Sequence, residues 1–204
     1  MTANLVKIID IRRVRGKQYR IRFNNDSELQ LTETMYFSAA WQVGDEIPVS
    51  DIRNIAATDQ IQRAKEKAIL LLSYRKRSKE ELRQRLTREK YSADTIRTVI
   101  NSLSEKGYLN DHDFAVSFAR DKVRNTGAGP RKIAMELSRH HIDDAMIEDV
   151  IQAVYREFPI PELIQTLLRK RHCDLHTRQD QQRAIRYLQG KGFYTEHILK
   201  EIRL

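Results

Sequence analysis

One stretch of the sequence has the residue types of a phosphate-binding loop. Residues 125–132 read NTGAGPRK, so two glycines and a proline precede an amphipathic run. Backbone N–H groups at a glycine-rich helix start attract anions, and nucleotide hydrolases use such a loop. Their loop needs a Lys-Ser or Lys-Thr pair after the last glycine, whereas Pro130 follows Gly129 here. The stretch therefore predicts a structural turn in which Pro130 opens a helix, with Arg131 and Lys132 as candidate anion contacts.

Clusters of arginine and lysine are the second feature that could do chemistry. Residues 74–90 read YRKRSKEELRQRLTREK, and residues 167–172 read LLRKRH. Cationic side chains neutralise phosphates and release counterions, so such clusters indicate a polyanionic partner, with a solvated helix face as the alternative. The candidate partner and DNA contacts are Arg75, Lys76, Arg77, Arg83, Arg88, Arg131, Lys132, Arg169, Lys170 and Arg171.

Residue patterns for catalysis or metal binding are missing from the sequence. His172, Cys173 and His176 lie near one another, but a zinc site needs three or four ligands at fitting spacings. Asp143 and Asp144 suit a helix start, where carboxylates are favoured by the helix dipole. No Ser/His/Asp or Cys/His arrangement is present. We therefore predict no catalytic residue, no metal and no cofactor, and a protein that is not an enzyme.

Composition narrows the class of protein. The chain has 204 residues, a net charge of +9 and a single cysteine. One cysteine excludes an internal disulfide framework and fits a reducing compartment. The sequence has no apolar run of membrane-spanning length and no signal peptide, so we expect a cytoplasmic protein without a membrane partner. The net charge is +1 over residues 1–55, +6 over 56–110, −2 over 111–158 and +4 over 159–204.

The first 55 residues have the period of β-strands. The segments VKIIDIRRV and QYRIRF alternate apolar with polar or basic residues, and Gly16 between them suits a hairpin turn. A third strand is expected in SELQL, followed by a short helix capped by Thr32 or Thr34. The segment GDEIPVSDI indicates extended chain, with Pro48 restricting it to a sheet edge. Residues 1–55 therefore predict a small β-rich module.

From about Gln60 the apolar period becomes helical, and the pattern repeats every 51 residues. A second shift of 51 residues keeps the pattern, with Glu201 as its one polar exception. The matched positions are Leu82, Leu86, Tyr91, Ile96, Val99, Ile100 and Leu103, then Ile133, Leu137, Ile142, Ile147, Val150, Ile151 and Val154, then Ala184, Leu188, Phe193, Ile198, Glu201 and Ile202.

Such periodicity is typical of tandem repeats that bury their apolar faces by stacking. Ser78, Ser92 and Asp143 stand at expected helix starts as capping residues, and Gly129 occupies the position of Ser78 one repeat later. We predict a mainly α fold of three tandem three-helix, helix-turn-helix-like repeats that form an elongated curved body after the β-rich module. The expected domains are residues 1–55, 56–110, 111–158 and 159–204.

Three segments of the chain resemble the RecX regulatory proteins of bacteria. The matching residues are Ser78, Glu81 and Leu82, then Gly107, Tyr108, Leu109, Asn110, Asp111, Phe114 and Ala115, and then Gly127, Gly129, Pro130, Glu136 and Leu137. Asn110 replaces the usual aspartate and can still cap a helix. His140 and His141 stand where the family usually has Lys-Gly, so one of them is expected in the left-handed conformation.

This resemblance covers about residues 60–200 and implies a function. Members of the family bind the RecA recombinase filament and restrain its growth, strand exchange, ATP hydrolysis and coprotease action in homologous recombination, DNA repair and the SOS response. The implied partners are the RecA filament and non-specific single- and double-stranded DNA, and the chain is expected to be a monomer. The alternative is a helix-turn-helix transcription regulator, since three-helix units with basic helices also read DNA sequence.

Overall fold

The computed structural model describes residues 4–173 and 175–202, which form two compact units. Unit 1 comprises the described residues up to 71 together with 84–102, and unit 2 comprises 72–83 together with the described residues from 103. Across the described part of the chain, no helix is both long and apolar enough to cross a membrane.

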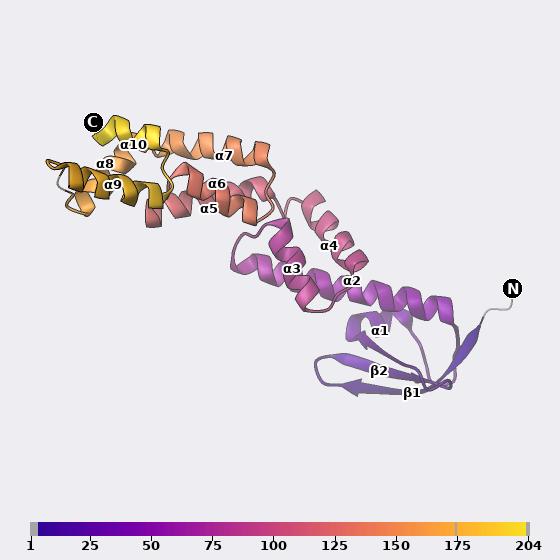
Figure 1. Cartoon of the computed structure of the whole chain (residues 1–204). Helices are drawn as coiled ribbons and strands as arrows, with labels where there is room; N and C mark the ends of the chain where they lie inside the picture. The colour runs from indigo at the N-terminus through magenta and orange to yellow at the C-terminus, as the bar shows by residue number, and fades with distance from the viewer. Residues whose placement is uncertain (1–3, 174, 203–204) are drawn as a thin grey trace. The chain divides into compact units, whose positions relative to one another are not determined.

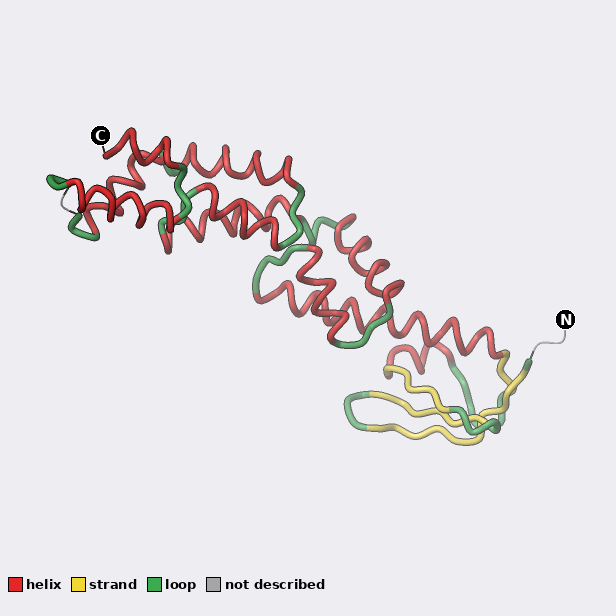
Figure 2. The backbone as a smooth tube through the Cα atoms, viewed as in Figure 1, coloured by secondary structure: helices red, strands yellow, loops and turns green. Residues whose placement is uncertain are grey.

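Unit 1 begins with a four-stranded antiparallel sheet (Figure 1). Its strands are β1 (Leu5–Val14), β2 (Gln18–Phe23), β3 (Glu28–Thr32) and β4 (Glu46–Pro48), in the spatial order β3-β2-β1-β4. The helices α1 (Glu33–Ala39) and α2 (Val49–Tyr74) lie on one face of this sheet, as Figure 2 shows. Buried Ile8, Ile21 and Leu31 pack there against Tyr36 of α1 and Ile52 of α2. The β-rich N-terminal module predicted from the alternating period is therefore confirmed.

The start of α2 differs from the prediction. Residues 49–52 were expected to continue the extended segment, and a helical period was expected only from about Gln60, but the helix begins at Val49. Pro48 ends the edge strand β4, and a proline just before a helix disrupts none of its hydrogen bonds. Ile52 and Ile55 then contribute to the core of the sheet, so tertiary burial favours a helix where the local pattern indicated a strand.

The remaining helices follow the predicted three-helix grouping. They are α3 (Lys79–Arg88), α4 (Ala93–Glu105), α5 (Asp111–Thr126), α6 (Pro130–Arg139), α7 (Asp144–Glu157), α8 (Ile160–Lys170), α9 (Arg178–Lys191) and α10 (Thr195–Ile202). Helix α6 starts 51 residues after α3, and α7 starts 51 residues after α4. The groups α5–α7 and α8–α10 each enclose a hydrophobic core within unit 2.

The buried residues of the second and third repeats recur with the 51-residue period found in the sequence. In the second repeat Ile133, Leu137, Ile142, Ile147, Val150 and Val154 are all buried, and in the third Ala184, Leu188, Phe193, Ile198 and Ile202 are buried. Glu201, which breaks the apolar pattern, is only half-buried at the end of α10. Most of the apolar positions that defined the repeat are therefore core positions, whereas Tyr91, Ile100 and Ile151 are half-buried.

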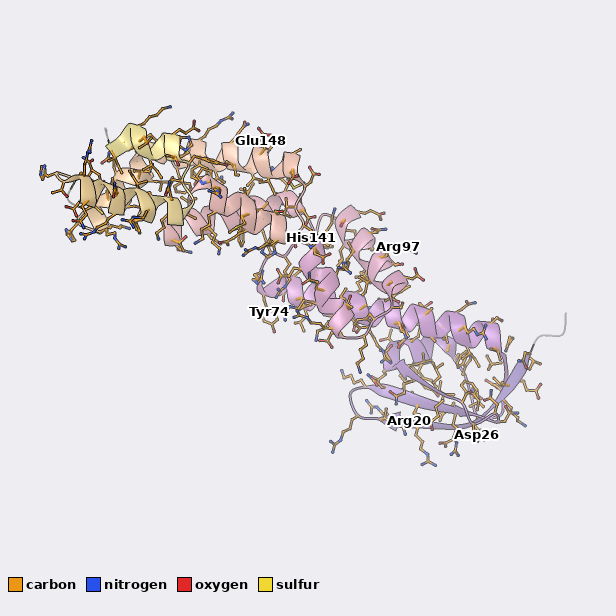
Figure 3. All side chains as sticks on the ribbon, in the orientation of Figure 1. Arg20, Asp26, Tyr74, Arg97, His141 and Glu148 are labelled. Atoms are coloured by element: carbon orange, nitrogen blue, oxygen red, sulfur yellow. The ribbon has the colours of Figure 1, made fainter. Side chains whose placement is uncertain are left out.

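The turn that follows the second helix of each repeat also recurs every 51 residues. Lys90, His141 and Gly192 all have positive φ, of 66°, 55° and 93°. The expectation that His140 or His141 would adopt the left-handed conformation is met by His141, labelled in Figure 3 at the turn between α6 and α7. A conformation favoured by glycine is thus kept in all three repeats, although only Gly192 is a glycine.

Candidate nucleic-acid interface in unit 2

The GAGP turn joins α5 to α6 without a side-chain cap. Gly127 ends α5 with φ 61°, and Gly129 occupies the N-cap position before Pro130, the first residue of α6. The Tyr155 hydroxyl of α7 donates a hydrogen bond of 2.6 Å to the Ala128 carbonyl oxygen. Burial raises the pKa of Tyr155, so the phenol remains protonated and keeps donating. The prediction of a structural turn with Pro130 at the helix start is confirmed.

Glycine is needed in this turn because another backbone lies directly against it. The Gly129 N–H donates to the Lys191 carbonyl oxygen at 2.8 Å, and the Arg131 N–H donates to the Gly192 carbonyl oxygen at 3.0 Å. A Cβ atom on Gly129 would lie 2.5 Å from the carbonyl carbon of Gly192, closer than a real Cβ approaches another heavy atom. The turn therefore docks the second repeat onto the third, and two of its N–H groups are used inside the protein rather than for a phosphate.

Lys191 also reaches across the same joint with its side chain. Its Nζ atom donates to the Thr126 carbonyl oxygen at the end of α5, at 2.8 Å, and lies 5.6 Å from the centre of the Tyr187 ring. The guanidinium carbon of Arg171 lies 4.5 Å from the centre of the same ring. Tyr187 therefore holds near one another, through cation–π attraction, Lys191 of α9 and Arg171, the residue just after α8.

Three hollows lie in the surface of unit 2, and Arg171 lines two of them. The first, of about 630 Å³, and the second, of about 490 Å³, share Asn125 and Thr126 as lining residues. The first and the third, of about 560 Å³, share Arg171 and Tyr187. The three hollows therefore neighbour one another through these shared residues, and we call them together the basic groove.

Basic side chains dominate the lining of the groove. They are Arg75, Lys76, Lys122, Arg124, Lys170, Arg171, Arg183, Arg186 and Lys191, whereas the acidic residues are Asp121 and Asp180. Part of this charge is compensated, since Lys122 pairs with Glu136 at 2.5 Å and Arg124 with Glu157 at 3.1 Å. Within the described residues, no carboxylate pairs with Lys76, Lys170, Arg171, Arg186 or Lys191. The groove therefore carries an uncompensated positive potential that suits a polyanion.

Aromatic rings are interspersed among these cations. Phe118 lies in the second hollow with Lys122 5.1 Å from its ring centre, and Phe158 lies in the first with Arg124 at 5.4 Å. A groove that alternates cations with aromatic rings has the chemistry by which proteins follow a nucleic-acid strand.

Only some of the predicted contact residues lie in the groove. Arg75 and Lys76 line one end, and Lys170 and Arg171 line the middle. Arg83 is exposed outside it and forms a two-pronged ion pair with Glu80, which raises the Arg83 pKa. The other exposed or half-buried candidates outside the groove are Arg88, Arg131, Lys132 and Arg169.

Arg77 is the candidate whose surroundings differ most from the expectation. Its side chain is 8% exposed and pairs with Glu81, which also binds Arg75. Glu81 is at the same time the third residue after Ser78, whose hydroxyl accepts a hydrogen bond from the Glu81 N–H. These contacts give Arg77 a structural place at the start of α3.

Several basic residues of the groove were not among the contacts predicted from the sequence. Lys122, Arg124, Arg183, Arg186 and Lys191 are spread over two helices and stand among acidic residues, so none of them forms a basic run. The available signal was Tyr187 followed four residues later by Lys191, since residues at this spacing are neighbours on a helix. Their convergence with Arg171 required the packing of α8 against α9 and α10.

Comparison with known proteins gives a consistent family. The family model described as "RecX, first three-helix domain" matches residues 64–103, and that described as "RecX, second three-helix domain" matches residues 110–151. A protein named Regulatory protein RecX from Bacillus velezensis is 34% identical over 74% of this chain and 58% of its own length. The protein of the same name from Bacillus subtilis is 32% identical with the same coverage.

Solved structures agree with these sequence matches. The crystal structure of RecX from Lactobacillus salivarius has a TM-score of 0.63 and 27% identity, and the match covers 72% of this chain and 96% of that one. A structure titled "Crystal structure of regulatory protein RecX" has a TM-score of 0.68, and the match covers 97% of this chain and 98% of that one. At 22% identity, this match supports the fold alone. The chain spans less than two thirds of the Bacillus proteins that it matches.

Proposed function

Because this chain belongs to the RecX family of regulatory proteins, we propose that it binds the RecA recombinase filament together with its DNA and restrains the filament. The proposed effect is a decrease in ATP hydrolysis, strand exchange and coprotease activity of RecA during recombinational repair and the SOS response. The chain acts in the cytoplasm as a monomeric binding protein and carries out no catalytic step of its own.

The basic groove is the observation that supports this proposal most directly. A RecA filament is assembled on DNA, so a regulator that follows it meets a repeating series of phosphates. The groove offers cations from the segment just after α2, from α5 and from the third repeat. One of them, Arg171, is held 4.5 Å from the centre of the Tyr187 ring. Such a surface binds phosphates regardless of base sequence, as a protein that acts along a filament requires.

The alternative, a sequence-specific transcription regulator, requires a different surface. A helix-turn-helix reader presents base-contacting side chains along one exposed recognition helix. In unit 2 the uncompensated cations converge from several helices, and the groove adjoins the joint between two repeats. This arrangement favours the filament regulator. A preference for one duplex sequence that survives competition by bulk DNA would instead support the alternative.

The test is the RecA ATPase assay on single-stranded DNA with increasing amounts of the purified chain. We expect ATP hydrolysis to fall, and we expect the variant Lys170→Glu/Arg186→Glu to inhibit at least tenfold less well because the groove loses two uncompensated cations. The matched control is Arg139→Glu/Arg156→Glu, which changes the net charge equally at two exposed positions of α6 and α7 outside the groove. Full ATPase activity at saturating amounts of the wild-type chain would refute the proposed function.

A further inference from the structure

The sheet of unit 1 carries an aromatic cluster at one end. Tyr19 of β2 stacks on Tyr36 of α1, with ring centres 4.1 Å apart and an angle of 17° between the rings. Phe37 meets Tyr19 edge to face, with ring centres 5.8 Å apart. Tyr36 also packs against the core of the sheet, but Phe37 is 64% exposed and contributes little to that core. The Phe37 ring is therefore accessible to a partner molecule next to the two stacked tyrosines.

The β1–β2 hairpin turn supplies positive charge beside this cluster. Residues 15–17 read Arg-Gly-Lys, and both of their charged side chains are exposed. The Glu33 N–H at the start of α1 donates to the Lys17 carbonyl oxygen at 2.9 Å, which fixes the turn next to the helix that carries Phe37. The carboxylate of Glu33 is engaged by Arg13 at 2.9 Å, so it does not compensate Arg15 or Lys17.

The opposite end of the sheet lacks this combination. The β2–β3 turn contains Asn24, Asn25 and Asp26, and no aromatic ring is exposed there within the described residues. Arg20, which Figure 3 labels on the strand between the two ends, pairs with Glu28 at 3.7 Å. Exposed aromatic surface and unpaired positive charge therefore coincide only at the hairpin end of this sheet.

We propose that this end of unit 1 is a site for single-stranded nucleic acid, separate from the basic groove. Phe37, beside the half-buried Tyr19–Tyr36 stack, offers its ring to an unstacked base, and Arg15 and Lys17 offer cations to the flanking phosphates. Duplex DNA keeps its bases stacked inside, so it cannot use the aromatic surface. A protein partner fits less well, because it would have to compensate two cations in addition to covering one phenylalanine.

The chain has a single tryptophan, so its intrinsic fluorescence can be used to measure ligand binding to unit 1 without RecA. Trp41 lies two residues after α1 and packs against the same core as Tyr36. The Tyr36 hydroxyl donates a hydrogen bond of 3.4 Å to the Trp41 carbonyl oxygen, so Trp41 fluorescence is coupled to the Tyr19–Tyr36 stack. We would titrate the full chain with a short oligothymidylate, without RecA, in the Lys170→Glu/Arg186→Glu background so that the groove contributes little.

We expect saturable quenching of Trp41, and Phe37→Ala should weaken the oligonucleotide affinity about tenfold because one stacking surface is lost. Phe37→Tyr should restore the affinity, since its ring also stacks. Arg15→Ala/Lys17→Ala should weaken binding and flatten its salt dependence. The matched control is Val43→Ala, which truncates an apolar side chain of unit 1 with 61% exposure outside the aromatic cluster.

Three results would overturn the proposal. The first is no Trp41 response, or an affinity unchanged by Phe37→Ala. The second is equally tight binding of a blunt duplex of the same length. The third is a Trp41 signal that depends on protein concentration without oligonucleotide, which would assign Phe37 to a contact between two copies of the chain. None of these results depends on RecA, so they are independent of the proposed function.

Discussion

At the scale of single residues, neighbouring cations of one basic run have different roles. Lys76 is exposed and lines the groove, whereas Arg77, the next residue, is buried in an ion pair with Glu81. Sequence composition treats the two alike because both are cations in the same run. Only their surroundings separate a candidate phosphate contact from an internal ion pair.

This difference predicts opposite effects of two substitutions. Arg77→Ala should lower the free energy of unfolding by about 3 kcal/mol, because it leaves the Glu81 carboxylate less well compensated in a largely buried position. Lys76→Glu should leave the free energy of unfolding nearly unchanged and weaken DNA binding. Urea unfolding and fluorescence anisotropy with labelled DNA measure the two effects. An Arg77→Ala protein of wild-type stability would contradict the structural assignment of Arg77.

At the scale of elements, the GAGP turn explains why the second repeat departs from the first. Ser78 caps α3 with its hydroxyl, whereas the equivalent Gly129 has no side chain and instead lies against the backbone of Gly192. A side-chain cap is therefore absent at Gly129, where the backbone of the α5–α6 turn lies close to the backbone at Gly192. Lys191, on the other side of this joint, contacts both Thr126 and Tyr187, so the joint also positions part of the groove.

Replacing Gly129 by alanine should therefore destabilise unit 2. The added methyl group would clash with backbone atoms of Gly192 and Phe193, which cannot move aside as a flexible side chain can. We expect a loss of about 1–3 kcal/mol in the free energy of unfolding, as for other overpacked sites.

Gly190→Ala is the matched control for this substitution. Gly190 lies inside α9, and a Cβ atom there would meet no other atom within 4 Å. Alanine in a helix is favoured over glycine, so this variant should gain about 0.5–1 kcal/mol. Thermal unfolding of both variants by circular dichroism decides the point. Equal stability of the two variants would contradict the explanation that Gly129 is required by its contact with the Gly192 backbone.

At the scale of the whole molecule, the net charge of +9 is not spread evenly among possible binding surfaces. Several of the 37 lysine and arginine side chains are paired with carboxylates, such as Arg83 with Glu80 and Arg97 with Asp94. Uncompensated cations collect in the basic groove of unit 2, and a smaller pair lies beside the aromatic cluster of unit 1. Since each unit carries its own cations, the salt dependence of binding can be assigned to them separately.

The groove should account for a measurable part of the salt dependence of single-stranded DNA binding. Each phosphate contact contributes about −0.7 to the slope of log K against log salt concentration. Lys170→Glu/Arg186→Glu removes two cations, so the slope should become shallower by about 1.4, while Arg139→Glu/Arg156→Glu should leave it unchanged. A salt titration of DNA affinity measures both. Equal slopes for the two variants would mean that the groove is not a phosphate site.

Much of this protein was determined by the sequence itself. The 51-residue period, the alternating strands and the caps Ser92, Asn110 and Asp143 predicted the elements and the core, because periodicity and capping depend on neighbours along the chain. The family resemblance also followed from local motifs, which are continuous in sequence.

The tertiary structure decided how those elements use their charges and glycines. Val49 begins a helix because the sheet core buries Ile52, and Arg77 is internal because Glu81 faces it. The groove and the aromatic cluster arise where distant segments meet, as Lys191 meets Thr126 and Lys17 meets Glu33. Pairing and burial depend on distances across the fold rather than along the chain, so a single sequence does not contain them in readable form.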